Sequence, residues 1–110
     1  MNFYDYVNML KHNDIPSLDL TLPECKDFID FLRDISYNRM SQVSQKEFDR
    51  MYRDFLWSAE DYERYTEAMT LEEVSQSEML DDKMMDLKIK LDDIAQYIQF
   101  DAGLYSYFKW

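Results

Sequence analysis

The chain has 110 residues, enough for one domain with a single modest hydrophobic core and too few for two independent ones. Apolar residues make up 46% of it and aromatic residues 16%, so the net charge of -11 does not indicate a disordered acidic tail. A surface this acidic disfavours nucleic acid and membranes as direct ligands and favours basic proteins. We therefore expect one acidic domain over residues 1–110.

The cysteine content and the first residues bear on the compartment. Cys25 is the only cysteine, which rules out an intramolecular disulfide, and the opening residues MNFYDYV contain neither a basic leader nor an apolar signal segment. The longest purely apolar runs have about three residues, far fewer than the roughly 18 that a membrane span needs. The sequence predicts a cytoplasmic protein without a membrane span.

Turn-forming residues are scarce, with one glycine and two prolines in the chain. A β fold of many strands would need more of them, so the sequence predicts an all-α fold, a small single-domain bundle of four to five helices. A short first helix is expected where apolar side chains recur at helical spacing over residues 3–10, and it should end at Asn13 and Asp14. Residues 15–22 (IPSLDLTL) predict a loop, with one short extended segment as the alternative.

Capping signals predict where the next helices begin. Thr21 and Glu24 have the spacing of a capping box, with Pro23 in the first turn. The helix that follows should end near Arg39. Its inward face is formed by Cys25, Phe28, Ile29, Leu32 and Ile35.

The next start is predicted at a second capping box, formed by Ser44 and Glu47, with Val43 and Phe48 as its hydrophobic staple. A third box, Thr70 with Glu73, marks the following helix. The inward face between these starts is formed by Phe48, Tyr52, Phe55, Ala59, Tyr62 and Met69.

The last helix has the clearest periodicity, formed by Leu80, Met84, Leu87, Leu91, Ile94 and Ile98. An ordinary core stripe and a coiled-coil seam both fit this spacing, and the core is favoured. A helix running unbroken from Thr70 would be about 48 Å long, so a break is expected near Ser75 or Ser77. Gly103 should end the helix in a left-handed cap covered by Leu104. Three apolar residues lie off this stripe: Met85, Ile89 and Phe100. They either pack inside a bundle or contact a partner.

No pattern in the chain indicates catalysis or a cofactor. Phosphate-binding and dinucleotide-binding loops need at least two nearby glycines, and zinc or di-iron sites need several Cys or His ligands. The chain has one glycine, one cysteine and one histidine, His12. The acid pairs at residues 81–82 and 92–93 are not set in a calcium-binding loop. The sequence predicts a non-enzymatic protein that uses no metal or cofactor.

Residues 58–82 (SAEDYERYTEAMTLEEVSQSEMLDD) hold nine carboxylates and one basic residue, Arg64. They form either a solvated helix surface or a surface that imitates the phosphates of nucleic acid. Spread along about 37 Å of helix, the net negative charge of this stretch amounts to about one charge per 4–5 Å, whereas duplex DNA carries roughly one charge per 1.7 Å. Any mimicry of nucleic acid is therefore partial. The predicted partner-binding residues are Trp57, Glu60, Glu63, Glu67, Glu72, Glu73, Glu78, Asp81, Asp82 and Trp110.

Two aromatic features complete this set. Trp57 points outward among Arg50, Arg53 and Arg64 if its helix is continuous, whereas the usual burial of tryptophan favours a core position reached through a kink at Ser58. The tail at residues 104–110 (LYSYFKW) is expected to pack on the domain or on a second copy, because bare aromatic side chains are costly in water.

In its size, its charge and its missing catalytic motifs, the chain is similar to the small acidic proteins with which phages and mobile elements inhibit host nucleases or restriction systems. The resemblance implies an inhibitor that occupies the basic nucleic-acid-binding surface of a partner, such as a nuclease complex. The alternative is a helical structural or adaptor subunit that forms a homodimer through the Leu80–Ile98 seam or the aromatic tail.

Overall fold

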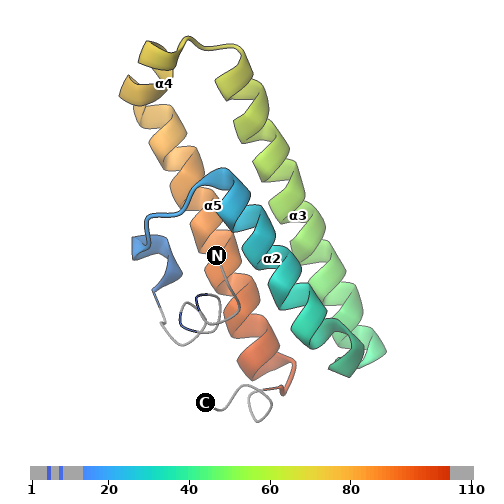
Figure 1. Ribbon diagram of the computed structural model, residues 1–110. Coiled ribbons are helices and arrows are strands. Elements are labelled where there is room, and N and C mark those ends of the chain that lie inside the picture. The colour runs from blue at the N-terminus through green and yellow to red at the C-terminus, as the bar shows by residue number, and fades with distance from the viewer. Residues whose placement is uncertain (1–4, 6–7, 9–13, 105–110) are drawn as a thin grey trace.

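The computed structural model describes Asp5, Asn8 and residues 14–104, and four α-helices make up most of this part (Figure 1). They are α2 (Leu22–Ser36), α3 (Gln42–Glu67), α4 (Leu71–Gln76) and α5 (Glu78–Gln96). Three short turns flank them: η1 (Ile15–Ser17), η2 (Tyr37–Arg39) and the π-helical η3 (Tyr97–Asp101). No strand occurs among these residues, and the predicted small all-α bundle is confirmed.

Helices α3 and α5 run antiparallel along the length of the molecule, and α2 packs across part of both (Figure 1). The structure is elongated, measuring 45 × 26 × 19 Å. At one end the chain leaves α3, passes through the short α4 and returns as α5, and this end projects beyond α2 (Figure 1). None of the described helices combines the length and the apolar character that crossing a bilayer requires.

The core is built on one face of α5. Leu87 and Leu91 of α5 and Ile98 of the following η3 are completely buried, so the periodic stripe is a core stripe, as favoured by the sequence. Opposite this stripe, α2 and α3 contribute further fully buried side chains: Cys25, Phe28, Ile29, Leu32, Phe48 and Phe55. The seam that the sequence offered for dimerisation is therefore occupied within the chain itself.

The first capping box is confirmed. The Thr21 hydroxyl accepts from the Glu24 amide at 3.4 Å, and the Glu24 carboxylate accepts from the Thr21 amide at 3.1 Å. The backbone of Thr21 lowers the pKa of Glu24 by this hydrogen bond, with help from the Thr21 hydroxyl. These contacts fix the start of α2 and direct its apolar face inward, although Ile35 is only half-buried.

The predicted start of α3 at Ser44 is wrong. The helix begins at Gln42, where Ser41 is the N-cap and its hydroxyl accepts from the Ser44 amide at 3.2 Å. Val43 is 79% exposed, so it forms no staple with Phe48. The earlier start is favoured because it buries Met40, just before the cap, in the core. The phase of the helix is unchanged.

The break in the last helical region is confirmed at Ser77. Its backbone is extended (ψ 112°), and its hydroxyl accepts from the Leu80 amide at 3.2 Å, which caps α5. Thr70 caps α4 by accepting from the Glu73 amide, also at 3.2 Å. Two hydroxyl caps close together thus reverse the chain between α3 and α5 without glycine.

The far end of α5 also follows the prediction. Gly103 adopts the left-handed region (φ 73°), and its amide donates to the Phe100 carbonyl at 3.4 Å. Leu104 is buried against the core beyond it. A side chain at position 103 would be strained by the backbone alone. Three predicted features lie outside the described residues: the first helix (apart from Asp5 and Asn8), His12 and the tail beyond Leu104.

Replacing Leu91 with alanine tests the core that α5 organises. Because Leu91 is completely buried, we expect Leu91→Ala to lower the free energy of unfolding by about 2–5 kcal/mol in urea denaturation followed by circular dichroism. The matched control is Leu71→Ala, the same chemical change at a side chain that is 90% exposed, which should cost less than about 0.5 kcal/mol. Equal losses in the two variants would contradict this packing.

Candidate functional site

The acidic stretch lies at the end of the bundle where α3 turns through α4 into α5, and we call residues 60–82 the acidic end (Figure 1). Two ion pairs mark its base. Lys26, in the first turns of α2, holds Glu63 with 3.0 Å between Nζ and Oε1, and Lys83 of α5 holds Asp61 of α3 at 2.5 Å. Past these contacts the chain projects beyond α2 (Figure 1).

Two of the acids at this end, Asp61 and Glu63, form ion pairs with lysines. Asp61 pairs with Lys83 and, at 3.6 Å, with Arg64, while Glu63 pairs with Lys26. The hydrogen bond from Lys83 to Asp61 raises the pKa of the lysine and keeps it charged. The other seven acids are all exposed: Glu60, Glu67, Glu72, Glu73, Glu78, Asp81 and Asp82. The acidic end therefore keeps most of its negative charge at the surface.

Helix capping accounts for four of these seven. Glu72 and Glu73 occupy the first turn of α4, and Glu78 and Asp81 the first turn of α5, where the helix dipole favours acids. Helix starts thus provide a structural reason for these residues. They provide none for the remaining three, Glu60, Glu67 and Asp82.

Trp57 is 62% exposed, so the core position favoured by the usual burial of tryptophan is wrong and the outward alternative is correct. Helix α3 runs without interruption from Gln42 to Glu67, and Ser58 does not break it. Because Phe55 and Ala59 are buried on the inward face, the helical phase turns Trp57 outward. An exposed tryptophan in a well-packed helix indicates a surface available for contact.

Trp57 borders an open groove between α3 and α5, with a volume of about 410 Å³. We call it the Trp57 groove. It is lined by Trp57, Ser58, Asp61, Met79, Asp82, Lys83, Asp86 and Lys90. Met79 is 42% exposed and adds apolar surface to the side formed by α5. The groove places two of the predicted partner-binding residues, Trp57 and Asp82, in one site.

The two lysines of this groove are held by the protein itself. Lys83 is bound to Asp61 and also lies 4.3 Å from the centre of the Tyr65 ring. Lys90 lies 3.3 Å from Asp54 and 3.2 Å from Asp86, and it donates to the Ser58 hydroxyl. These contacts join α3 to α5 along one side of the bundle.

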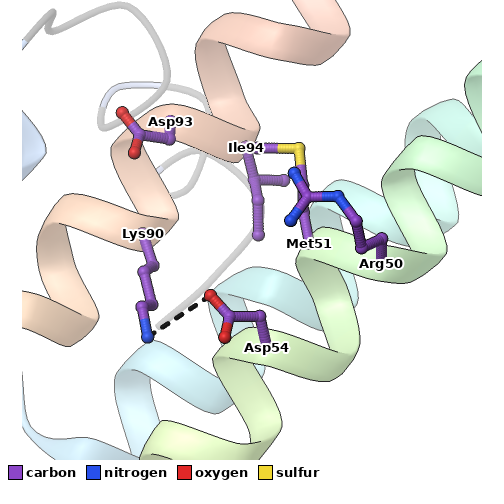
Figure 2. Close-up of a pocket in the computed structure, with 6 residues that line it drawn as sticks. All are labelled: Arg50, Met51, Asp54, Lys90, Asp93 and Ile94. Atoms are coloured by element: carbon purple, nitrogen blue, oxygen red, sulfur yellow. Dashed lines mark ion pairs between the residues drawn. The ribbon is translucent and has the colours of Figure 1, made fainter.

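Figure 2 shows the smaller pocket that adjoins the groove and shares Lys90 with it. Here the Lys90 ammonium points to Asp54 across the helix pair, beside the apolar side chains of Met51 and Ile94 (Figure 2). Arg50 stands over this pocket, but its guanidinium is paired with Glu47 of its own helix. The cations on this side therefore already have acidic partners.

The predicted site residues fall into three groups. Trp57 and Asp82 both line the groove, and the other exposed acids lie at the same end of the bundle. Glu63 is half-buried in its ion pair with Lys26, and Trp110 lies outside the described residues. No sequence pattern indicates Met79 or the lysine contacts as part of a site, because both depend on the pairing of α3 with α5.

The described residues contain no group of three His, Cys, Asp or Glu side chains placed to hold a metal ion. Cys25 is completely buried in the core, as the sequence favoured. Its burial raises the pKa of the thiol from 9.0 to about 11, although the charge of Lys88 opposes part of this shift. A buried, protonated thiol is a poor nucleophile.

The reactivity of Cys25 tests this placement. We expect a thiol reagent at pH 8 to leave the native protein unmodified and to react at once after unfolding in denaturant. Since the pKa is raised in the folded state, Cys25 stabilises the fold fully below pH 9.0, and this contribution is lost as the pH rises towards about 11. Cys25→Ala should flatten the fall in stability over that range. Rapid labelling of the native protein would show that the thiol is accessible.

Comparison of the chain with protein-family models, with curated proteins and with solved structures finds no match. Its function is therefore inferred from the geometry and charge of the acidic end and the Trp57 groove.

Proposed function

We propose that this protein is a non-enzymatic, acidic protein-binding module that inhibits its partner by occupying a basic nucleic-acid-binding surface. The observation that carries the proposal is the exposure of Glu60, Glu67 and Asp82 at the same end as Trp57. Within the part of the chain that the structure describes, neither helix capping nor ion pairing accounts for these three acids. A basic partner in the cytoplasm, such as a nuclease complex of the kind that phage or mobile-element proteins inhibit, would account for them.

The fold strengthens the case for partial mimicry of nucleic acid. A straight helix would spread the charge of residues 58–82 thinly compared with the phosphates of DNA. The chain instead folds back through α4, which gathers the acids of α3 and α5 at one end of the bundle (Figure 1). This arrangement suits a groove that binds a single strand or one side of a duplex, where a few lysines and arginines set the affinity.

The acids and the apolar residues have separate parts in this proposal. Exposed carboxylates attract a basic partner over a distance and raise the rate of association, an effect that salt screens. Trp57 and Met79 supply contact area once the surfaces meet, and tryptophan is among the residues that most often dominate binding energy.

A structural or adaptor subunit is the second candidate. Burial of Leu87, Leu91 and Ile98 leaves no free seam for a dimer in the folded domain, and the aromatic tail beyond Leu104 lies outside the described residues. Met85 and Ile89 favour this candidate, because both are more than 40% exposed on α5. A subunit of this kind would change its mass with protein concentration and would bind independently of salt.

The charge-reversed variant Glu60→Lys, Glu67→Lys, Asp82→Lys tests the proposed function. The wild type, this variant and a matched control are each used to capture partners from cells of the source organism at about 50 and 200 mM salt. Nucleic acid is then added to each captured complex to test whether it displaces the partner. We expect the wild type to capture a basic protein at low salt, nucleic acid to displace it, and the reversed variant to lose it, mainly through slower association.

The matched control, Asp34→Lys, Asp93→Lys, Asp101→Lys, makes the same change in net charge at exposed acids outside the acidic end. It should still capture the partner with only a small loss, because long-range attraction depends on net charge but docking depends on position. If both triple variants bind as the wild type does, the acids of this end are solvated surface and the proposal is wrong.

A further inference from the structure

We infer that the Trp57 groove binds an arginine side chain presented by the basic partner. The inference rests on the proposed function and specifies its central contact. The groove is open, lies at the base of the acidic end and has the volume of a small-ligand pocket, about 300–1,000 Å³. Its lining combines an aromatic face, an apolar thioether and carboxylates.

The tryptophan supplies the surface on which a cation would stack. The face of an indole ring attracts a cation more strongly than that of any other side chain. The protein already uses this interaction internally, since the Arg33 guanidinium lies 5.4 Å from the Tyr37 ring centre and 5.3 Å from that of Tyr52. No described cation is placed in this way on Trp57, although arginines lie one and two turns from it on the same helix.

Those arginines are engaged elsewhere. Arg50 is bound to Glu47, Arg53 donates to the Asp49 carbonyl, and Arg64 pairs with Asp61. The lysines of the groove are likewise bound to Asp61, Asp54 and Asp86, so they neither stack on the indole nor leave an unpaired positive charge to repel an incoming cation. The aromatic face is therefore free for a cation from outside.

A carboxylate is available in the same groove. Asp82 is exposed, lines the groove and forms no hydrogen bond or ion pair with any part of the chain that the structure describes. Asp86, one turn further along α5, forms an ion pair with Lys90 at 3.2 Å. The charged residues that line the groove are three aspartates, Asp61, Asp82 and Asp86, and two lysines, Lys83 and Lys90. The net charge of the lining is therefore negative.

Arginine fits this combination better than lysine. Its guanidinium is planar, so one face stacks on the indole while two parallel N–H groups reach a carboxylate. Its hydrocarbon stem would lie on Met79. A lysine ammonium is a compact and strongly hydrated charge that can be satisfied by any exposed acid of this end, without the ring.

Two labelled peptides of equal charge, nona-arginine and nona-lysine, test the inference by fluorescence anisotropy at low salt. We expect the wild type to bind nona-arginine about three- to tenfold more tightly than nona-lysine. Trp57→Ala and Asp82→Asn should each bring this ratio towards one. Trp57→Leu, which keeps an apolar side chain but removes the aromatic face, should do the same.

The matched control is Glu67→Gln, which removes one charge from an exposed acid that does not line the groove. It should weaken both peptides equally and leave the ratio unchanged. Circular dichroism checks that each variant keeps its helices, which is expected because Trp57 and Asp82 are exposed.

Each other outcome is decisive. If the ratio in Trp57→Ala, Trp57→Leu and Asp82→Asn equals that of the wild type, the arginine site is wrong, while salt-dependent binding of both peptides would still support an acidic docking surface. If neither peptide binds the wild type at low salt, both the groove and the proposed function are wrong.

Discussion

Burial of one face of α5 against α2 and α3 is the constraint on which the remaining structure depends. Leu87, Leu91 and Ile98 have no access to solvent, and they meet the aromatic side chains of both neighbouring helices. This contact fixes the rotation of α3 about its own axis. Once Phe55 faces α5, Trp57 must face solvent, because the two positions lie about 200° apart around a helix.

The acidic end exists because α3 and α5 extend past the part of the bundle that α2 covers. A projection of two helices has little core, so exposed carboxylates there displace no apolar packing. Their mutual repulsion still opposes folding. Lys83 and Lys90 offset part of it by linking α5 to acids of α3, and in doing so they hold the two walls of the groove together. The same contacts thus serve stability and shape the surface offered to a partner.

Much of the fold could be predicted from the sequence, because the signals involved are local. The Thr21 box, the break at Ser77 and the cap at Gly103 each depend on residues within one helical turn, and all three are confirmed. The start of α3 does not follow from local signals, because two serines three residues apart give competing caps. Tertiary packing of Met40 decides between Ser41 and Ser44, and no local pattern contains that contact.

The candidate site was less predictable for the same reason. The exposed acids of residues 58–82 can be recognised from composition, but their gathering at one end depends on the reversal through α4. The average behaviour of tryptophan favours a core position for Trp57, whereas the helical phase set by Phe55 and Ala59 decides that it is exposed. Contacts such as Lys90 with Asp54 join helices far apart in the chain, so only the folded structure shows them (Figure 2).

The central claim is that partners dock at the acidic end and the Trp57 groove. The most direct measurement is a map of amide chemical-shift changes in the ¹⁵N-labelled protein as nona-arginine is added. The account predicts the largest changes around Trp57 and across residues 60–86, with the Trp57 indole N–H among the signals that move most. Changes spread evenly over all exposed acids, or concentrated near η2 and the start of α3, would contradict it.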